Sequence, residues 1–136
     1  MLLSICSAQT AKDRGKSTNT CVNFRTGTFY SIIPGNGYCV RNDSVARMYM
    51  YNDTTLFYEY SIIWTSDCEM QMKFIKSNDS KSKSRDGDVL FVNLKPIDPT
   101  TYLYEMKLVN KQYPEGYNYR MGSSSTEKLK SFLKKK

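Results

Sequence analysis

The sequence predicts an all-β domain in which antiparallel strands follow one another as an up-and-down meander. About seven or eight strands should form a closed or partly open barrel, with a β-sandwich as the alternative. Aromatic residues make up 13% of the 136 residues, with eleven tyrosines, and such residues favour strands. Residues 60–74, YSIIWTSDCEMQMKF, place apolar side chains at nearly every even position, which is the period of a half-buried strand. A barrel is favoured over a sandwich because closure removes exposed strand edges.

The first half of the chain supplies four or five of the expected strands. Residues 21–33 form a β-rich stretch, starting at Cys21, that Gly27 interrupts, and PGNG at 34–37 then forms a turn. Segments 38–43, 44–51 and 55–63 follow, separated by Asn-Asp pairs whose short side chains suit turns. Residues 60–74 exceed the length of an ordinary strand, so Thr65-Ser66-Asp67 is expected to form a corner between two strands.

The second half begins with a polar, charged loop at 77–87. Two strands are expected at 88–97 and 101–110, joined across Asp98-Pro99-Thr100, and a short one at 117–121. Residues 122–136 form a basic tail in which Thr126 could cap one or two helical turns. The barrel domain is therefore expected to span residues 21–121.

The N-terminal segment indicates export. Residues 1–9 resemble the last part of a secretory signal, with cleavage expected near Ala8 or Gln9, and lipidation of Cys6 is the alternative. Residues 10–20 read as a flexible leader. No apolar run of about 18 residues is present, so no transmembrane segment is expected. We therefore expect a monomer in the periplasm, in the envelope or outside the cell.

Charge gives a weak nucleic-acid signal. The last ten residues carry +4 of the formal charge of +7, which leaves the body nearly balanced. An OB-like nucleic-acid-binding barrel would need Arg25, Arg41 and Arg47 aligned beside exposed tyrosines on one face. Export and the balanced body argue against that partner.

Residue types exclude most catalytic sites. The chain has no histidine, which removes His-based triads, the usual zinc-enzyme ligand sets and the simplest general base near neutral pH. No phosphate-binding glycine loop or dinucleotide motif occurs. Asp67 and Glu69 lie two residues apart on the polar face, where solvated carboxylates are the commoner case. We therefore expect no enzyme activity, no cofactor and no metal.

The cysteines and the apolar face of residues 60–74 remain as candidate features. If Cys6 leaves with the signal, Cys21 and Cys68 could lie at one end of the barrel and form a disulfide, with Cys39 free; three reduced, buried cysteines are the alternative. A barrel of about eight strands can hold one small apolar molecule. The candidate pocket residues are Phe29, Tyr60, Ile62, Trp64, Met70 and Met72, which could equally fill a core. A tyrosine-rich patch around Tyr38, Tyr49, Tyr51 or Tyr113 would instead favour a protein-interaction module.

Three segments together resemble a group of uncharacterised small exported proteins of Bacteroidota: CVNFRTGTF at 21–29, VRND at 40–43 and IIWTSDCEMQMKF at 62–74. That group shares a Cys, a Phe-Arg/Lys-Thr-Gly-x-Phe start, an Arg-x-Asp turn and a Trp-x-x-Asp-Cys corner. The resemblance implies an exported, lipocalin-like barrel in which Cys21 and Cys68 are the two cysteines of the group, and Cys39 departs from its pattern. Phe29 stands where lipocalins have a tryptophan in the first strand. The resemblance implies no particular function.

Overall fold

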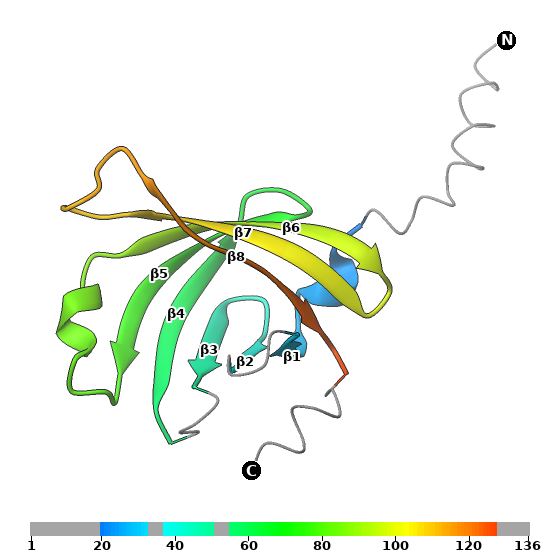
Figure 1. The fold of residues 1–136 in the computed structure, drawn as a ribbon, viewed down its shortest axis with the longest axis horizontal. Coiled ribbons are helices and arrows are strands. Elements are labelled where there is room, and N and C mark those ends of the chain that lie inside the picture. The colour runs from blue at the N-terminus through cyan, green and yellow to red at the C-terminus, as the bar shows by residue number, and fades with distance from the viewer. Residues whose placement is uncertain (1–19, 33–36, 51–54, 128–136) are drawn as a thin grey trace, which may run out of the picture.

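The computed structural model describes residues 20–32, 37–50 and 55–127. Within these ranges the chain forms a closed antiparallel barrel, which confirms the predicted fold class (Figure 1). The signal-like segment 1–9, the leader apart from Thr20, the Asn-Asp pair at 52–53 and the expected C-terminal helix lie outside the described residues.

Eight strands follow one another around the barrel, and each pairs with the next along the chain. The barrel closes where β1 meets β8 through the pairs Tyr30 with Ser125 and Ser31 with Ser124. The strands are β1 (Gly27–Ser31), β2 (Tyr38–Arg41), β3 (Val45–Tyr49), β4 (Phe57–Trp64), β5 (Glu69–Ser77), β6 (Val89–Asp98), β7 (Thr101–Val109) and β8 (Tyr117–Ser125).

The two ends of the barrel differ. The short 3-10 helix η2 (Val22–Phe24) lies at one end, together with the β2–β3, β4–β5 and β6–β7 turns; we call this the plugged end. At the other end, which we call the mouth, β1, β3, β5 and β7 end and β2, β4, β6 and β8 begin, and the β5–β6 connection there contains η3 (Ser82–Arg85) (Figure 1).

Two strand boundaries differ from those expected. A strand starting at Cys21 was the wrong prediction, because residues 22–24 form a 3-10 turn in which the Phe24 N–H donates to the Cys21 carbonyl at 2.9 Å. β1 begins only at Gly27, whose φ of +133° suits glycine alone. At the other end of the chain, β8 continues to Ser125, beyond the expected strand at 117–121.

Two expected turns are confirmed. β4 ends at Trp64 and β5 begins at Glu69, and the N–H groups of Thr65 and Ser66 donate to the Glu69 carbonyl at 2.8 and 3.3 Å. In the β2–β3 turn the Asn42 side-chain oxygen accepts hydrogen bonds from the backbone of Ser44 and Val45, both at 2.9 Å. Such bonds replace the ladder partners that a turn loses.

Alternate residues of each strand face the interior, as the period of two requires. β4 shows the pattern most fully, because its even-numbered residues from 58 to 62 are buried while Ile63 is 63% exposed. The buried interior is formed by Phe29, Ala46, Tyr58, Tyr60, Ile62, Met70, Met72, Leu90, Val92, Leu94, Tyr102, Met106 and Leu108, with Cys21 and Phe24 from the plugged end.

Candidate ligand cavity

The barrel interior contains a cavity of about 200 Å³ that extends from the plugged end to the mouth. Most of its wall is aliphatic, aromatic or thioether surface, and five of its lining residues are methionines, which adapt easily to an occupant. The methionines are Met48, Met50, Met70, Met72 and Met106; the other apolar and aromatic side chains are Phe29, Tyr58, Tyr60, Leu90, Val92, Leu94, Tyr102 and Tyr104. Tyr38 and Tyr49 also border the cavity, although they occupy outward-facing positions of β2 and β3.

Four of the six candidate pocket residues line this cavity, namely Phe29, Tyr60, Met70 and Met72. Ile62 is buried in the core and is not part of the cavity wall. Trp64 also lies away from the wall, half-buried at the plugged end, where the Arg25 guanidinium stacks over its indole at 4.3 Å. Their partners on β5, Met72 opposite Ile62 and Met70 opposite Trp64, do line the cavity, so distance from the plugged end does not separate the two pairs.

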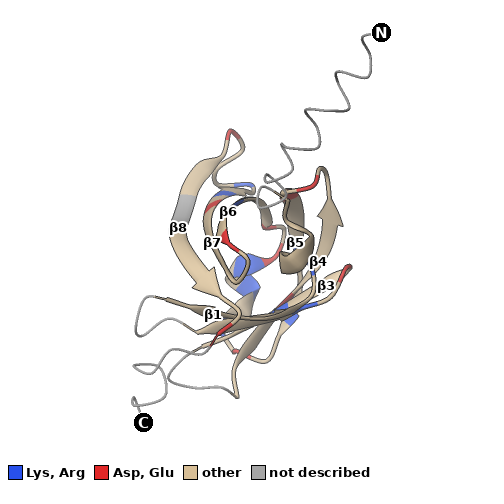
Figure 2. Cartoon of the chain, turned by 90° about the vertical axis from the view of Figure 1, so that its right-hand side faces the viewer, with Lys and Arg blue, Asp and Glu red and all other residues tan. Residues whose placement is uncertain are grey.

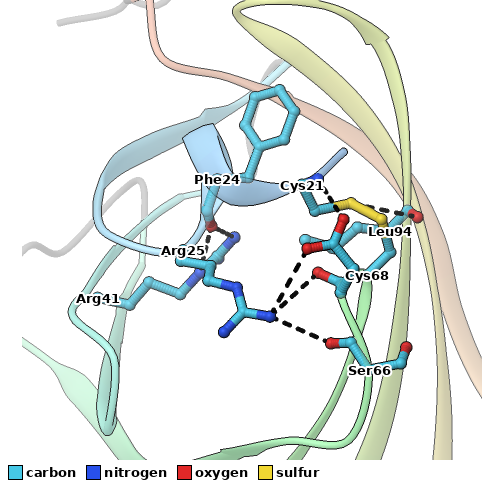
Figure 3. The surroundings of a disulfide bond; sticks show 8 residues. Cys21, Phe24, Arg25, Arg41, Ser66, Cys68 and Leu94 are labelled. Atoms are coloured by element: carbon cyan, nitrogen blue, oxygen red, sulfur yellow. Dashed lines mark hydrogen bonds and ion pairs between the residues drawn. A yellow bond between two sulfur atoms is a disulfide. The ribbon is translucent and has the colours of Figure 1, made fainter. Parts of the chain in front are cut away.

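A disulfide between Cys21 and Cys68 fastens η2 to the β4–β5 corner (Figure 3), which confirms the predicted pairing. Cys39 is a free thiol in the cavity wall. Phe24, which is 1% exposed, closes the plugged end by packing its ring 4.8 Å from that of Tyr102 and 6.3 Å from that of Phe29. The end of the barrel is thus sealed by one aromatic side chain and one covalent link.

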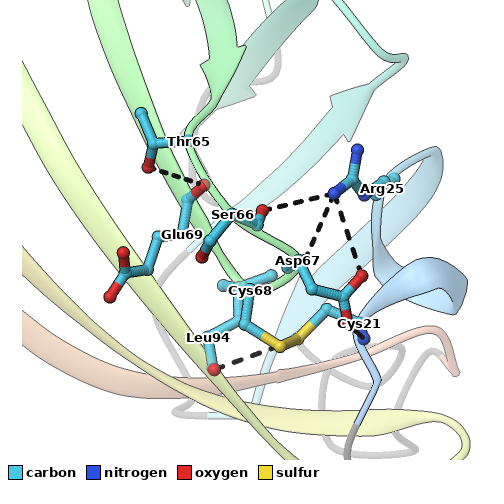
Figure 4. Close-up of polar contacts among 8 residues, drawn as sticks. All are labelled: Cys21, Arg25, Thr65, Ser66, Asp67, Cys68, Glu69 and Leu94. Atoms are coloured by element: carbon cyan, nitrogen blue, oxygen red, sulfur yellow. Dashed lines mark hydrogen bonds and ion pairs between the residues drawn. A yellow bond between two sulfur atoms is a disulfide. The ribbon is translucent and has the colours of Figure 1, made fainter.

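Polar contacts hold the same corner (Figure 4). Asp67 accepts a hydrogen bond from the Cys21 N–H at 3.2 Å, and Arg25 donates to the carbonyl oxygens of Ser66 and Asp67 at 3.3 and 3.5 Å. The Arg25–Asp67 ion pair at 3.9 Å is solvent-exposed and contributes little. Residues from two of the three resembling segments therefore meet at the plugged end, where they hold η2 against the barrel.

Arg41 supplies a buried positive charge at the base of the cavity. Its side chain leaves β2 toward the interior and donates to the Phe24 carbonyl through Nε at 3.1 Å and through a terminal nitrogen at 2.6 Å (Figure 3). The other terminal nitrogen donates to the Tyr102 hydroxyl at 3.3 Å and lies 3.8 Å from the Cys39 sulfur. The guanidinium also stacks 4.2 Å from the centre of the Phe29 ring. Arg41 therefore links the plug, two strands and the cavity wall.

Comparison of the chain with protein-family models, with curated proteins and with solved structures finds no match in any of the three. The cavity must therefore be interpreted from its own chemistry.

The neighbours of Arg41 are neutral near pH 7. Burial raises the pKa of the Cys39 thiol above its ordinary value, although Arg41 lowers it in part. Burial likewise raises the pKa of Tyr102, against a smaller opposite effect of Arg41. The guanidinium itself remains protonated in proteins. Arg41 thus carries the formal charge at the base of the cavity.

A second polar cluster lies at the mouth. The Tyr58 hydroxyl donates to the Asp79 carboxylate, and the Arg85 guanidinium lies 4.4 Å from the centre of the Tyr58 ring. The bond from Tyr58, together with one from the Lys81 N–H, lowers the pKa of Asp79, and the same bond raises the pKa of Tyr58. This cluster fastens the β5–β6 connection to β4 beside the cavity opening.

Replacing Tyr58 with Phe is expected to lower the urea midpoint of unfolding at pH 6 and to change it less at pH 3. The folded-state pKa of Asp79 lies below its unfolded value of about 3.9, so its contribution is present above that pH and is lost as the pH falls through the folded value. Urea titrations of both proteins across this range measure the difference. A difference that is the same at pH 3 and pH 6 would contradict the assignment.

The outer face of β1–β4 carries a row of aromatic rings. Tyr38 stacks on Tyr49 with centroids 4.9 Å apart, Tyr30 and Phe57 extend the row at 5.7 and 6.5 Å, and Arg47 lies 3.9 Å over Phe57. Of the other tyrosines named for a patch, Tyr113 stacks on Tyr117 near the mouth and Tyr51 lies outside the described residues.

The three arginines considered for nucleic acid do not share one face. Arg41 points into the barrel, Arg47 pairs with Glu59 at 2.9 Å on the outside, and Arg25 lies at the plugged end. In Figure 2 basic and acidic segments are interspersed around the barrel.

Among the described residues no three His, Cys, Asp or Glu side chains gather as metal ligands, and none of the helices found there could cross a membrane.

Proposed function

We propose that this protein is a non-catalytic, exported, monomeric barrel that binds one small apolar molecule in its interior. The observation that carries this proposal is the cavity of about 200 Å³, which is lined mainly by methionine, tyrosine and aliphatic side chains and reaches the mouth. It is smaller than pockets for drug-sized ligands and somewhat larger than a cavity of roughly 150 Å³ that admits benzene. The proposed occupant therefore has on the order of eight to ten non-hydrogen atoms.

Export and family membership belong to the same proposal. Support for export comes from the intramolecular disulfide, because such bonds persist in oxidising compartments. Membership of the Bacteroidota group is supported by the three resembling segments, whose residues Phe24, Arg41 and Cys68 have defined roles around the plug.

A secreted or envelope protein-interaction module is the second candidate function. The row of rings from Tyr30 to Phe57 on the outer face of β1–β4 favours it, because aromatic side chains are enriched at protein interfaces.

Filling the cavity tests the first candidate. We expect the wild type to bind 1-octanol in a calorimetric titration and Leu90→Trp, which places an indole in the cavity, to lose that binding by at least about tenfold. Phe91→Trp is the matched control, because Phe91 is the next residue of β6 and is 41% exposed on the outside. Equal binding by all three proteins, or none by the wild type, would refute interior binding.

A further inference from the structure

Among the residues that the structure describes, the cation at the base of the cavity has no counter-ion. Arg41 is 6% exposed, and the ion pairs among the described residues join Arg25 to Asp67, Arg47 to Glu59 and Lys95 to Glu105, none of which involves Arg41. No Asp or Glu is among the described residues that line the cavity. The hydrogen-bond partners of Arg41 are the Phe24 carbonyl, the Tyr102 hydroxyl and the Cys39 thiol, all of them uncharged groups.

Such an arrangement favours an anion. A buried charge loses its hydration and normally regains that energy from an opposite charge. The stacking of Arg41 on Phe29 and its bonds to Phe24 offset part of the loss and explain a structural role at the plug. They add no negative charge, because the pKa values of both Cys39 and Tyr102 are shifted toward the neutral form.

The donors of Arg41 are also incompletely used. A guanidinium has five N–H groups in a planar fork. Nε and one terminal nitrogen each direct one N–H to Phe24, and the other terminal nitrogen directs one to Tyr102 and one to the weak sulfur acceptor of Cys39. A carboxylate would be a stronger acceptor than either Tyr102 or Cys39, because bonds between ions are shorter and stronger.

We infer that the ligand is a short amphiphile with an anionic head, whose head binds Arg41 and Tyr102 at the base while its apolar chain lies among the methionines. This inference rests on the proposed interior binding and adds the chemical class and the orientation of the ligand. A linear carboxylate of about ten non-hydrogen atoms, such as octanoate, matches both the charge at the base and the cavity volume.

The test compares octanoate with 1-octanol, which has a nearly equal chain and no charge, in calorimetric titrations of the wild-type protein. We expect octanoate to bind at least about tenfold more tightly, the factor expected when a hydrogen bond to a charged group is gained. Equal affinities would overturn the anionic head and leave interior binding intact. Failure of both compounds to bind would overturn interior binding itself.

Two variants then locate the head group. Arg41→Gln should lower the affinity for octanoate by at least about tenfold and the affinity for 1-octanol by less than about threefold. Tyr102→Phe keeps the ring that packs on Phe24 and should lower the affinity for octanoate but not for 1-octanol. It therefore replaces Arg41→Gln in this test if Arg41→Gln does not fold. Arg47→Gln, on the outside of the barrel where Arg47 pairs with Glu59, is the matched control and should leave octanoate binding unchanged. A loss with Arg47→Gln as large as with Arg41→Gln would refute the position at the base.

Discussion

Replacing Cys21 and Cys68 together with alanine is expected to lower the free energy of unfolding by about 4 kcal/mol. The disulfide joins residues separated by 47 positions, and the chain-entropy model gives about this loss when a loop of that length is no longer closed in the unfolded state. The link also holds η2 at the end of the barrel, so its loss should affect the plug first. Urea denaturation of the variant and the wild type measures the difference.

The free thiol provides the control for this experiment. Cys39→Ala leaves the disulfide intact and is expected to cost about 1 kcal/mol, mainly through lost apolar contact in the cavity wall. Wild-type protein treated with a reductant should unfold at the same urea concentration as the double variant. If the double variant is as stable as the wild type, the disulfide does not hold the plug.

Replacing Phe24 with alanine is expected to lower stability by about 3–5 kcal/mol, the range for truncating a fully buried phenylalanine. The ring packs between Phe29 and Tyr102, and its removal leaves a void at the end of the cavity. Thermal or urea unfolding measures the loss.

Val22→Ala is the matched control because Val22 lies in the same 3-10 turn and is 62% exposed. It should change stability by less than about 0.5 kcal/mol. Similar losses for Phe24→Ala and Val22→Ala would show that the turn as a whole, and not the Phe24 ring, closes the barrel.

Local patterns in the sequence account for much of the fold. The alternation in residues 60–74 and the turn residues at Thr65-Ser66-Asp67 determine two strands and their corner, because both depend on near neighbours in the chain. The same alternation identifies which side chains of β4 face inward. It does not show which inward side chains border the cavity, because Ile62 and Trp64 lie outside the cavity wall while Met72 and Met70, their partners on β5, line it.

The charged base of the cavity depends on contacts that sequence patterns do not reveal. The sequence offers Arg41 as a nucleic-acid ligand and as part of the VRND segment, whereas its partners Phe24 and Tyr102 lie 17 and 61 residues away. One sequence signal does indicate that Arg41 faces inward. Arg41 lies two residues from Cys39 and therefore shares a face of β2 with it. Local sequence patterns do not predict the 3-10 turn at 22–24, because Cys21 at its start is held by Cys68 and Asp67. Cys68 lies 47 residues further along the chain.

The most direct test of interior binding is to observe the cavity methionines by NMR, with 13C-labelled methyl groups, while octanoate or 1-octanol is added. Five methionines line the cavity: Met48 from β3, Met50 directly after β3, Met70 and Met72 from β5, and Met106 from β7. If the ligand enters the barrel, their methyl signals should shift together along one saturable curve and show contacts to the protons of the ligand chain. Saturable binding that leaves all five signals unchanged would place the ligand outside the barrel and contradict the account.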